Sequence, residues 1–478
     1  MSLINEIKDV VNSHQSEAIM LNDEIWKYAE LRFHENKSAE LLSGVLEKEG
    51  FDVGKGLAGI GTAFRATYGT GKPVIGILGE FDALSGLSQQ AGVCTEEPLV
   101  EGGSGHGCGH NSLGAASLTA AVAVKDYLLK HGSEGTIIFF GCPGEEGGSG
   151  KTFMARAGVF DSLDAALTWH PGTHNAVFNA ETLANYQVYF KYFGKSSHAS
   201  ASPYLGRSAL DAVELMNVGV NYLREHMIPQ ARIHYAVTDT GGKSPNVVQA
   251  EAEVLYLIRA PQVKQVDELY SRVCNIARGA ALMTGTRLKI SFDKACSNFI
   301  PNRTLGKLLE QEFCRIGAPP FTEEDYVFAR KMRETFSEDD IGDSLDLARR
   351  MMGSRAKDLF GSYRDKILSD TIIPMDYKPF KLFGSTDVGD VSRIVPTAQI
   401  YAACYAIGTP GHSWQIVSQG TTPMAHKGML TAAKVLAAAA LALLQDRTIT
   451  EEAKKELSES LDGATYVCPI PENVEPHI

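Results

Sequence analysis

The chain has 478 residues, of which 44% are hydrophobic and 21% are charged. This length exceeds what one hydrophobic core normally serves, so at least two domains are expected. The composition is typical of a globular protein and excludes a disordered chain or a membrane protein. The formal net charge of -12 comes without any basic stripe, so nucleic acid is not expected as a partner.

The ends of the chain indicate neither export nor a membrane. Residues 1–20 are amphipathic and acidic, whereas a signal peptide needs basic residues followed by an apolar run. The longest apolar tract, 432–444, is interrupted by Lys434 and is shorter than the roughly 20 residues that span a bilayer, so we expect a core helix. Eight scattered cysteines suit a reducing compartment. A cytoplasmic location is therefore expected.

The first and last parts of the chain alternate between short apolar runs and longer helical patterns. This alternation predicts an α/β domain with a mainly parallel sheet flanked by helices. The strands expected are 74–78, 136–140, 165–169 and 398–406. The helices expected, from apolar residues at three- and four-residue spacing, are 21–32, 38–49, 111–129 and 427–444.

The middle of the chain changes to period-two alternation. It predicts strands at 185–193, 232–238, 251–258 and 287–292, with helices at 206–226 and 263–283. The resulting order βαββαβ is that of a ferredoxin-like unit. We therefore predict a catalytic domain formed by 1–183 and 301–478, interrupted by a small domain at 184–300. Within the second part, 321–370 is charged and helical in pattern, and is expected to be a peripheral insertion without chemistry.

The densest group of candidate metal ligands is His106, Cys108 and His110, at alternate positions of a glycine-rich loop. Glycines let the backbone fold tightly, so that neighbouring side chains converge, and thiolate and imidazole suit zinc or a similar transition metal. The helix expected from residue 111 favours a thiolate at Cys108 through its N-terminal dipole. The alternative is a glycine-rich turn with incidental polar residues.

A pair of carboxylates, Glu145 and Glu146, follows the strand expected at 136–140. Adjacent carboxylates repel each other, but they can divide the work if one binds metal and the other acts as a general base. The alternative is a solvated acidic turn. The overlapping sequence GGSGKT (147–152) suggests a phosphate-binding loop, but Glu145 stands where that motif requires glycine. Nucleotide binding is therefore only a minor rival.

Other polar groups follow the ends of predicted strands. His170 follows the strand at 165–169, His412 follows the strand at 398–406, and Glu80 and Asp82 follow the strand at 74–78. Ligands bind at this edge of open α/β sheets. A lone histidine after a strand is more often structural, but the coincidence of several such positions favours a shared site.

Taken together, these motifs resemble the M20 family of metallopeptidases and amidohydrolases. They are GEFDAL (79–84), HGCGHN (106–111), GEEGGSGKTFM (144–154), WHPG (169–172), GKSSHAS (194–200), GSTDVGD (384–390) and GTPGHS (408–413). The resemblance spans nearly the whole chain except the 321–370 insertion. The cysteine-containing loop is similar to the branch that hydrolyses N-acyl and aryl-acyl amino acids.

The resemblance implies two divalent metal ions, zinc or manganese, per chain. Cys108 would bridge the ions, and the other ligands would be His110 and His170 at one site and Glu146 and His412 at the other. Glu145 would be the general base.

This ligand set has one alternative, and the sequence departs from the family at two nearby positions. His426 is the alternative to His412 as the last ligand. Leu78 and Asn111 stand where the family usually has an arginine and an aspartate. These departures put in doubt a role for Glu80 or Asp82 in supporting the ligands.

The resemblance also gives the small domain the role of a lid and dimerisation domain. His198 would reach the partner's active site to stabilise the oxyanion, and Asn246 and Arg259 would contact the substrate. The guanidinium fork of Arg259 suits a carboxylate. A homodimer through this domain is expected, and a related A subunit is left open as a partner.

The expected function is two-metal-dependent hydrolysis of the amide bond of an N-acyl amino acid. Resemblance points to an aryl acyl group, with p-aminobenzoyl-glutamate as the first candidate and indole-acyl-aspartate or a dipeptide behind it. The rival from another class is a catalytically silent relative that binds a peptide or serves as an accessory subunit.

Overall fold

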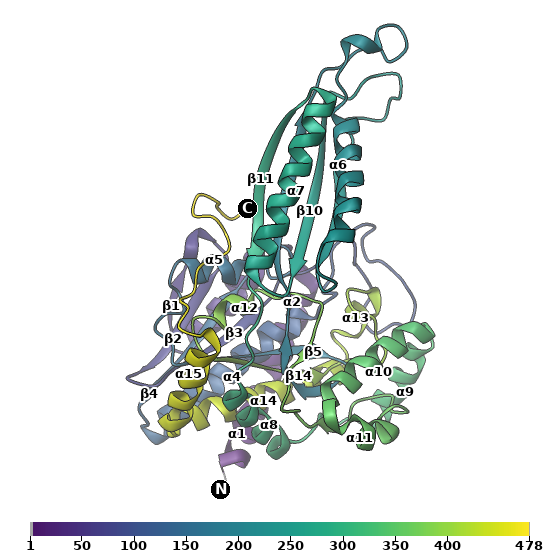
Figure 1. The fold of residues 1–478 in the computed structure, drawn as a ribbon. Coiled ribbons are helices and arrows are strands. Elements are labelled where there is room, and N and C mark those ends of the chain that lie inside the picture. The colour runs from purple at the N-terminus through teal and green to yellow at the C-terminus, as the bar shows by residue number, and fades with distance from the viewer. Residues whose placement is uncertain (1–2, 478) are drawn as a thin grey trace.

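The computed structural model describes residues 3–477, and its elements form an eight-stranded sheet, a four-stranded sheet and a small two-stranded sheet, with helices flanking the two larger sheets (Figure 1). The helices are α1 (Leu3–Ser13), α2 (Gln15–Tyr28), α3 (Asn36–Lys48), α4 (His110–His131), α5 (Gly150–Arg156), α6 (Ala209–Leu223), α7 (Val263–Thr284), α8 (Arg303–Ile316), α9 (Glu323–Arg333), α10 (Glu338–Met352), α11 (Ala356–Tyr363), α12 (Val388–Val391), α13 (Trp414–Gln419), α14 (Pro423–Gln445) and α15 (Arg447–Leu461). The strands are β1 (Asp52–Lys55), β2 (Phe64–Thr70), β3 (Val74–Glu80), β4 (Gly135–Cys142), β5 (Ala165–Gly172), β6 (Asn175–Val177), β7 (Ala180–Glu181), β8 (Ala184–Phe193), β9 (Arg232–Asp239), β10 (Glu251–Ala260), β11 (Arg287–Cys296), β12 (Ile372–Ile373), β13 (Phe380–Lys381) and β14 (Thr397–Ala403).

The larger sheet has the strand order β1-β2-β4-β3-β5-β14-β6-β12. Its centre is parallel, because β3 pairs with β4 and β5, and β14 pairs with β5, in the same direction. Antiparallel pairs occur between β1 and β2, β2 and β4, and β14 and β6. The prediction of a mainly parallel sheet is confirmed. Strand β4 is buried along its whole length, as expected for a central strand covered on both faces.

Alternate side chains of the central strands enter two different cores, because successive residues of a strand point to opposite faces. Ile75 and Ile77 of β3 pack in the core that contains α4 and α14. Leu78 of β3 packs in the other core, with Phe153 of α5. Because the sheet is packed between these two cores, the strand ends that carry the candidate site are held in place.

One helix, α14, is long and apolar enough to cross a membrane, with a mean hydropathy of 1.6 over its most apolar window. It is longer than the apolar tract expected from the sequence, but 83% of that window is buried inside the protein. The expectation of a core helix is confirmed.

The second sheet is antiparallel, with the strand order β11-β8-β10-β9. Counted within the segment, this is the order 4-1-3-2 of a ferredoxin-like unit, as the sequence predicts. Helices α6 and α7 pack together on it, and the whole unit projects from the larger sheet (Figure 1). Alternate residues of β10 are buried, since one face of the sheet is covered by these helices.

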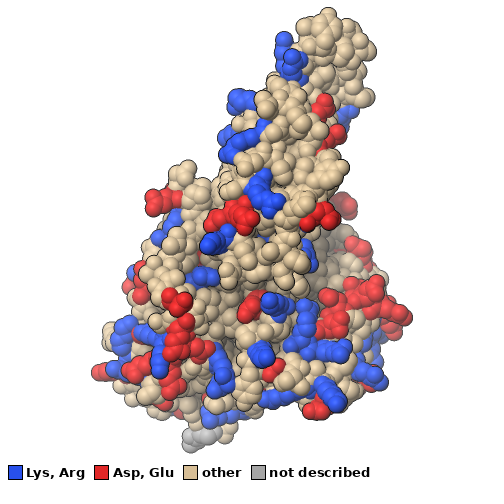
Figure 2. All heavy atoms as spheres, viewed as in Figure 1, with Lys and Arg blue, Asp and Glu red and all other residues tan. Residues whose placement is uncertain are grey.

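The insertion is helical and packs against the segment that follows β14. Ala348 and Met351 of α10 pack with Ile407, just after β14, and Ala329 of α9 packs with Ala406. The insertion therefore supports the loop that follows β14. Figure 2 shows acidic side chains gathered over this part of the surface, whereas Lys, Arg, Asp and Glu are interspersed over the rest of the visible face.

Candidate metal centre

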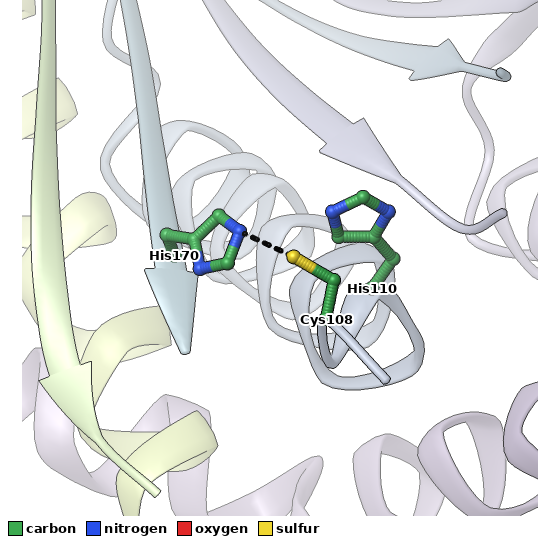
Figure 3. Close-up of side chains that lie close together, drawn as sticks. All are labelled: Cys108, His110 and His170. Carbon is green, nitrogen blue, oxygen red and sulfur yellow. Dashed lines mark hydrogen bonds between the residues drawn. The ribbon is translucent and has the colours of Figure 1, made fainter. Parts of the chain in front are cut away.

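Two groups of candidate ligands meet at the carboxyl edge of the central parallel strands and share one cysteine. Cys108, His110 and His170 form one group, and Cys108, Glu146 and His412 form the other. Within each group the donor atoms all lie within 4.8 Å of one another. Figure 3 shows the Cys108 thiol lying between the imidazoles of His110 and His170. All five residues predicted as ligands are thus brought together.

The approach of the cysteine loop to β5 depends on Gly109, which has φ of 80° and precedes α4. A Cβ atom at this position would collide with the hydroxyl of Tyr405 and lie 2.7 Å from Pro171. Glycine therefore permits both the left-handed turn and the close contact, and it lets Cys108 and His110 face the same space.

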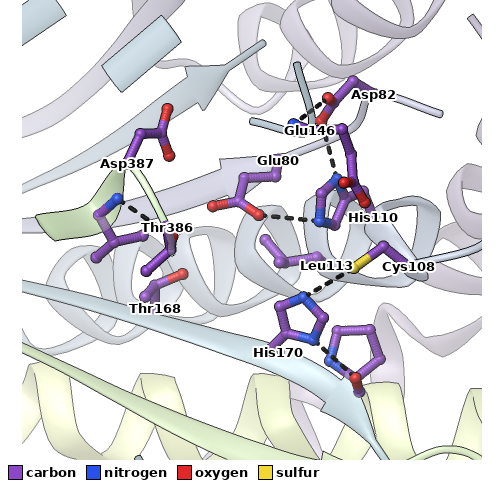
Figure 4. Close-up of polar contacts among 12 residues, drawn as sticks. Glu80, Asp82, Cys108, His110, Leu113, Glu146, Thr168, His170, Thr386 and Asp387 are labelled. Atoms are coloured by element: carbon purple, nitrogen blue, oxygen red, sulfur yellow. Dashed lines mark hydrogen bonds and ion pairs between the residues drawn. The ribbon is translucent and has the colours of Figure 1, made fainter. Parts of the chain in front are cut away.

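The imidazole of His110 is completely buried and held by Asp82 (Figure 4). Its Nδ1 lies 2.9 Å from one carboxylate oxygen of Asp82, and the other oxygen accepts the backbone N–H of Glu146 at 2.9 Å. Asp82 therefore positions two candidate ligands at once. His110 Nε2 lies 3.2 Å from Glu80 but makes no hydrogen bond to any residue in the range 3–477.

His170 has the same arrangement at the end of β5. Its Nδ1 lies 2.8 Å from the backbone oxygen of Pro171, and its Nε2 lies 3.4 Å from the Cys108 sulfur. In both histidines one ring nitrogen is fixed by an oxygen acceptor and the other faces the cysteine. Metal-binding histidines are commonly oriented in this way.

His412 completes the second group from the loop after β14. Its Nε2 lies 3.4 Å from a Glu146 oxygen, and its backbone has φ of 51°, which strains a residue other than glycine and is typical of functional sites. The rival ligand His426 instead lies 2.9 Å from Asp23 and belongs to neither ligand group. The geometry favours His412.

Two other polar residues of the cysteine loop face away from the ligand groups. His106 is buried and lies 2.9 Å from the Ile25 carbonyl oxygen, and burial lowers its pKa to about 3. Asn111 donates a hydrogen bond to Asn22 at 2.9 Å. Both are structural residues of this loop.

Opposing effects set the pKa of Cys108. Burial and Glu146 act to raise it, but His170 and His110 outweigh them and lower the pKa of the thiol to about 6. In return, the thiol and Glu146 raise the pKa of His412 to about 11. The thiolate and carboxylate thus attract positive charge, which protons supply here and which a metal ion would supply instead.

The residues fit divalent metal ions. His110 Nε2 and Glu146 Oε1 are buried without hydrogen-bond partners among the described residues. Such atoms are costly unless another group satisfies them. Thiolate and imidazole suit zinc, while the carboxylate also suits manganese.

Glu145 lies beside the ligands, in a third cluster with Glu80 and His110. Burial, followed by the charges of Glu80 and Asp387, raises the pKa of Glu145 well above its usual value. Its acidic neighbours therefore favour the protonated form of this carboxyl group.

The lysine of GGSGKT is not available to a phosphate. The Lys151 side chain is fully buried, and its Nζ lies 2.5 Å from Asp387 and 2.7 Å from Glu80. Its positive charge is paired with these two buried carboxylates. The nucleotide-binding alternative is therefore not supported.

A cavity of about 610 Å³ opens above the ligand groups. Cys108, His170 and His412 lie in its wall, and residues of α10 line another part of it. This volume is typical of a site for a small molecule. The insertion, expected to carry no chemistry, borders the same cavity through α10.

Comparison with known proteins agrees with this geometry. Residues 76–439 match the model of peptidase family M20/M25/M40. The chain belongs to this family. It is a hydrolase, and it is 49% identical to the B subunit of p-aminobenzoyl-glutamate hydrolase from Escherichia coli over 98% of both chains. It is also 29% identical to an Xaa-Arg dipeptidase of Mus musculus, over 76% of this chain and 86% of that one.

A solved member of the M20 family, described as a dinuclear metal-binding peptidase from Bacillus subtilis, has the same fold. It superposes with a TM-score of 0.55 at 15% sequence identity, and the match covers 91% of this chain and 99% of that chain.

The family residues expected on the small domain belong to neither ligand group. His198 and Asn246 are exposed, and His198 Nδ1 accepts backbone N–H groups from Ser200 and Ala201. Arg259 is half-buried, and its Nε has no hydrogen-bond partner within residues 3–477. Burial lowers the pKa of Arg259, and the charge of nearby Glu145 partly offsets this effect.

Three supporting residues were missed by sequence reasoning. Lys151 and Asp387 form a buried ion pair beside Glu80. The motifs GGSGKT and GSTDVGD contain these two residues and could have drawn attention to them. Arg32 donates hydrogen bonds to the Gly147 carbonyl and to Asp293 of β11. It therefore connects the Glu145–Glu146 loop to the small domain, and no sequence pattern marks it.

Proposed function

We propose that this chain hydrolyses the amide bond of an N-acyl amino acid with an aryl acyl group, and that p-aminobenzoyl-glutamate is the first candidate substrate. The observation that carries the proposal is the pair of ligand groups that share Cys108 at the wall of a cavity. The 49% identity to one chain of a p-aminobenzoyl-glutamate hydrolase over nearly the full length supports the choice of substrate.

The proposed cofactors are two divalent ions, zinc or manganese. Cys108 would contact both, His110 and His170 would complete one set of ligands, and Glu146 and His412 would complete the other. When bound, such ions lower the pKa of water and polarise a carbonyl group. Asp82 would keep His110 and Glu146 in place through its two hydrogen bonds, and Glu80 would face the same imidazole.

Glu145 is the proposed general base. It accepts a proton from the attacking water, whose oxygen then bonds to the amide carbon. As the carbon–nitrogen bond breaks, Glu145 returns the proton to the leaving nitrogen. The products are a carboxylic acid and a free amino acid, and Glu145 regains its starting state. Its place beside His110 and Glu80 supports this role.

The proposed lid is the small domain at 184–300. Arg259 and Asn246 would bind a carboxylate of the substrate, and Arg259 has a buried guanidinium nitrogen without a partner among the described residues. His198 would donate a hydrogen bond to the oxyanion in the partner's site, which its exposed position supports.

A homodimer through this lid is also proposed. Its edge strand β9 exposes Tyr235 and Val237, and α6 exposes Leu215, Val218 and Tyr222 at three- and four-residue spacing. Unpaired strand edges and apolar stripes favour association. A related A subunit is the alternative partner. We propose the cytoplasm as the location, because all eight cysteines are free.

Two other substrate classes remain as alternatives, indole-acyl-aspartate and dipeptides. The similarity to an Xaa-Arg dipeptidase favours the dipeptide. A hydrolysis screen of N-acyl glutamates, N-acyl aspartates and dipeptides, with zinc or manganese added, tests all three.

The Glu145→Ala variant should lose turnover in this screen and retain normal metal content. Turnover by that variant would contradict the role of Glu145. A wild-type protein that holds metal and cleaves none of these amides would favour a silent accessory subunit instead.

A further inference from the structure

Helix α10 of the insertion forms a wall of the cavity that the metal centre also borders. Asp343, Leu347, Arg350 and Met351 line the cavity, and their spacing of three and four residues places them on one face of the helix. The helix therefore presents to the cavity a mixed surface, with an apolar part and charged groups.

This wall is fixed relative to the metal ligands. The carbonyl oxygen of Ser344 lies 2.9 Å from Nε2 of His174, which is four residues after His170. The hydroxyl of Ser344 accepts the backbone N–H of Gly408 at 3.2 Å, in the loop that leads to His412. These two hydrogen bonds hold α10 against the segments that carry His170 and His412.

The buried part of the wall is apolar. Leu347 is half-buried and Met351 is 5% exposed. Tyr401, Tyr405 and Ile416 line other parts of the same cavity. Aromatic and aliphatic side chains of this kind suit a flat apolar body such as an aryl ring.

The charged part of the wall is predominantly acidic. Asp339, Asp340 and Asp343 border the cavity against a single arginine, Arg350. Asp340 accepts hydrogen bonds from Ser337 at the start of the helix. The Asp343 carboxylate has no ion pair or hydrogen bond with any residue that the structure describes, so it is free to accept one.

This distribution of charge favours one orientation of the substrate in the cavity. The carboxylates of an amino acid would be repelled by the acidic wall and attracted by Arg259 of the small domain, which interacts through its charge with Glu145 beside the ligand groups. The acyl group would therefore extend toward α10. A nitrogen at its far end would find an acceptor in Asp343 rather than a repelling charge.

We infer that α10 is the specificity wall for the acyl group and that Asp343 accepts a hydrogen bond from a nitrogen at the far end of that group. The inference rests on the proposed function and adds the chemistry of the preferred acyl group: an apolar, flat body that ends in a hydrogen-bond donor or a cation.

The test compares p-aminobenzoyl-glutamate with benzoyl-glutamate, which differ only in the para amino group. We expect wild-type protein to prefer the amino substrate by about tenfold in kcat/KM, the effect of one hydrogen bond to a charged group. Asp343→Asn should remove most of this preference, because it lowers kcat/KM more for the amino substrate than for benzoyl-glutamate. The matched control is Asp346→Asn, an exposed residue of α10 outside this cavity, which should retain the preference.

A second readout needs no turnover. Calorimetric binding of the two substrates to Glu145→Ala protein should show the same preference, and the double variant with Asp343→Asn should lose it. If Asp343→Asn lowers kcat/KM for both substrates equally, or leaves the preference intact, the inference is wrong. If the metal-loaded wild type cleaves neither substrate, the proposed function fails first, which is a distinguishable result.

Discussion

Asp82 offers the sharpest test of how the metal centre is built. Its side chain is 1% exposed, and its two oxygens lie 2.9 Å from His110 Nδ1 and 2.9 Å from the Glu146 nitrogen. In Asp82→Asn, an NH₂ group replaces one carboxylate oxygen. Either the Nδ1–H of His110 or the backbone N–H of Glu146 then loses its acceptor and faces the NH₂ donor instead. One proposed ligand is then no longer held in place.

The expected loss is that of one hydrogen bond to a charged group, about 1.5–3 kcal/mol. Metal affinity should therefore fall by about 10–100-fold, as is usual when a partner of a metal-binding histidine is removed. The assay is competition for zinc with a chelator of known affinity.

The matched control for this assay is Asp23→Asn, because Asp23 also lies 2.9 Å from a histidine, His426, but outside both ligand groups. It should leave zinc affinity unchanged. Unaltered zinc affinity in Asp82→Asn would refute the reasoning.

Three further predictions concern stability. Lys151→Met leaves two buried carboxylates without their cation and should lower the free energy of unfolding by about 3–5 kcal/mol in a urea titration. Gly408→Ala puts a Cβ 2.9 Å from Ile341 at φ of 103°, and should cost about 1–3 kcal/mol in the same assay. The hydrogen bond with Asp126 raises the pKa of His14, so its stabilisation is complete below the unfolded-state pKa and disappears as the pH rises through the folded-state pKa. The stability difference between wild type and His14→Gln should thus be larger near about pH 6 than near about pH 9; an equal difference would contradict it.

The fold and the convergence of the candidate ligands could be predicted because both depend on local patterns. His170 and His412 each follow an apolar run, and the carboxyl ends of parallel strands meet at one edge of a sheet. Cys108 and His110 lie in a loop whose glycines are visible in the sequence. Local pattern and tertiary structure therefore agree at these positions.

The cavity wall formed by α10 could not be predicted, because it depends on how this charged helix packs against the rest of the larger domain. Asp343, Leu347 and Arg350 have a spacing that suits any solvent-exposed helix. Only the contacts of Ser344 with His174 and Gly408 bring that face to the cavity. The roles proposed for His198 and Asn246 do not follow from the geometry of this chain, because both residues are exposed.

The central claim is a two-metal centre in which Cys108 is a shared ligand. Elemental analysis of purified protein, loaded with zinc or manganese and freed of excess ions, tests it most directly when wild type is compared with Cys108→Ala. We expect two ions per wild-type chain, one for each ligand group, and loss of metal from the variant. A single ion in wild type, or full occupancy in Cys108→Ala, would contradict it.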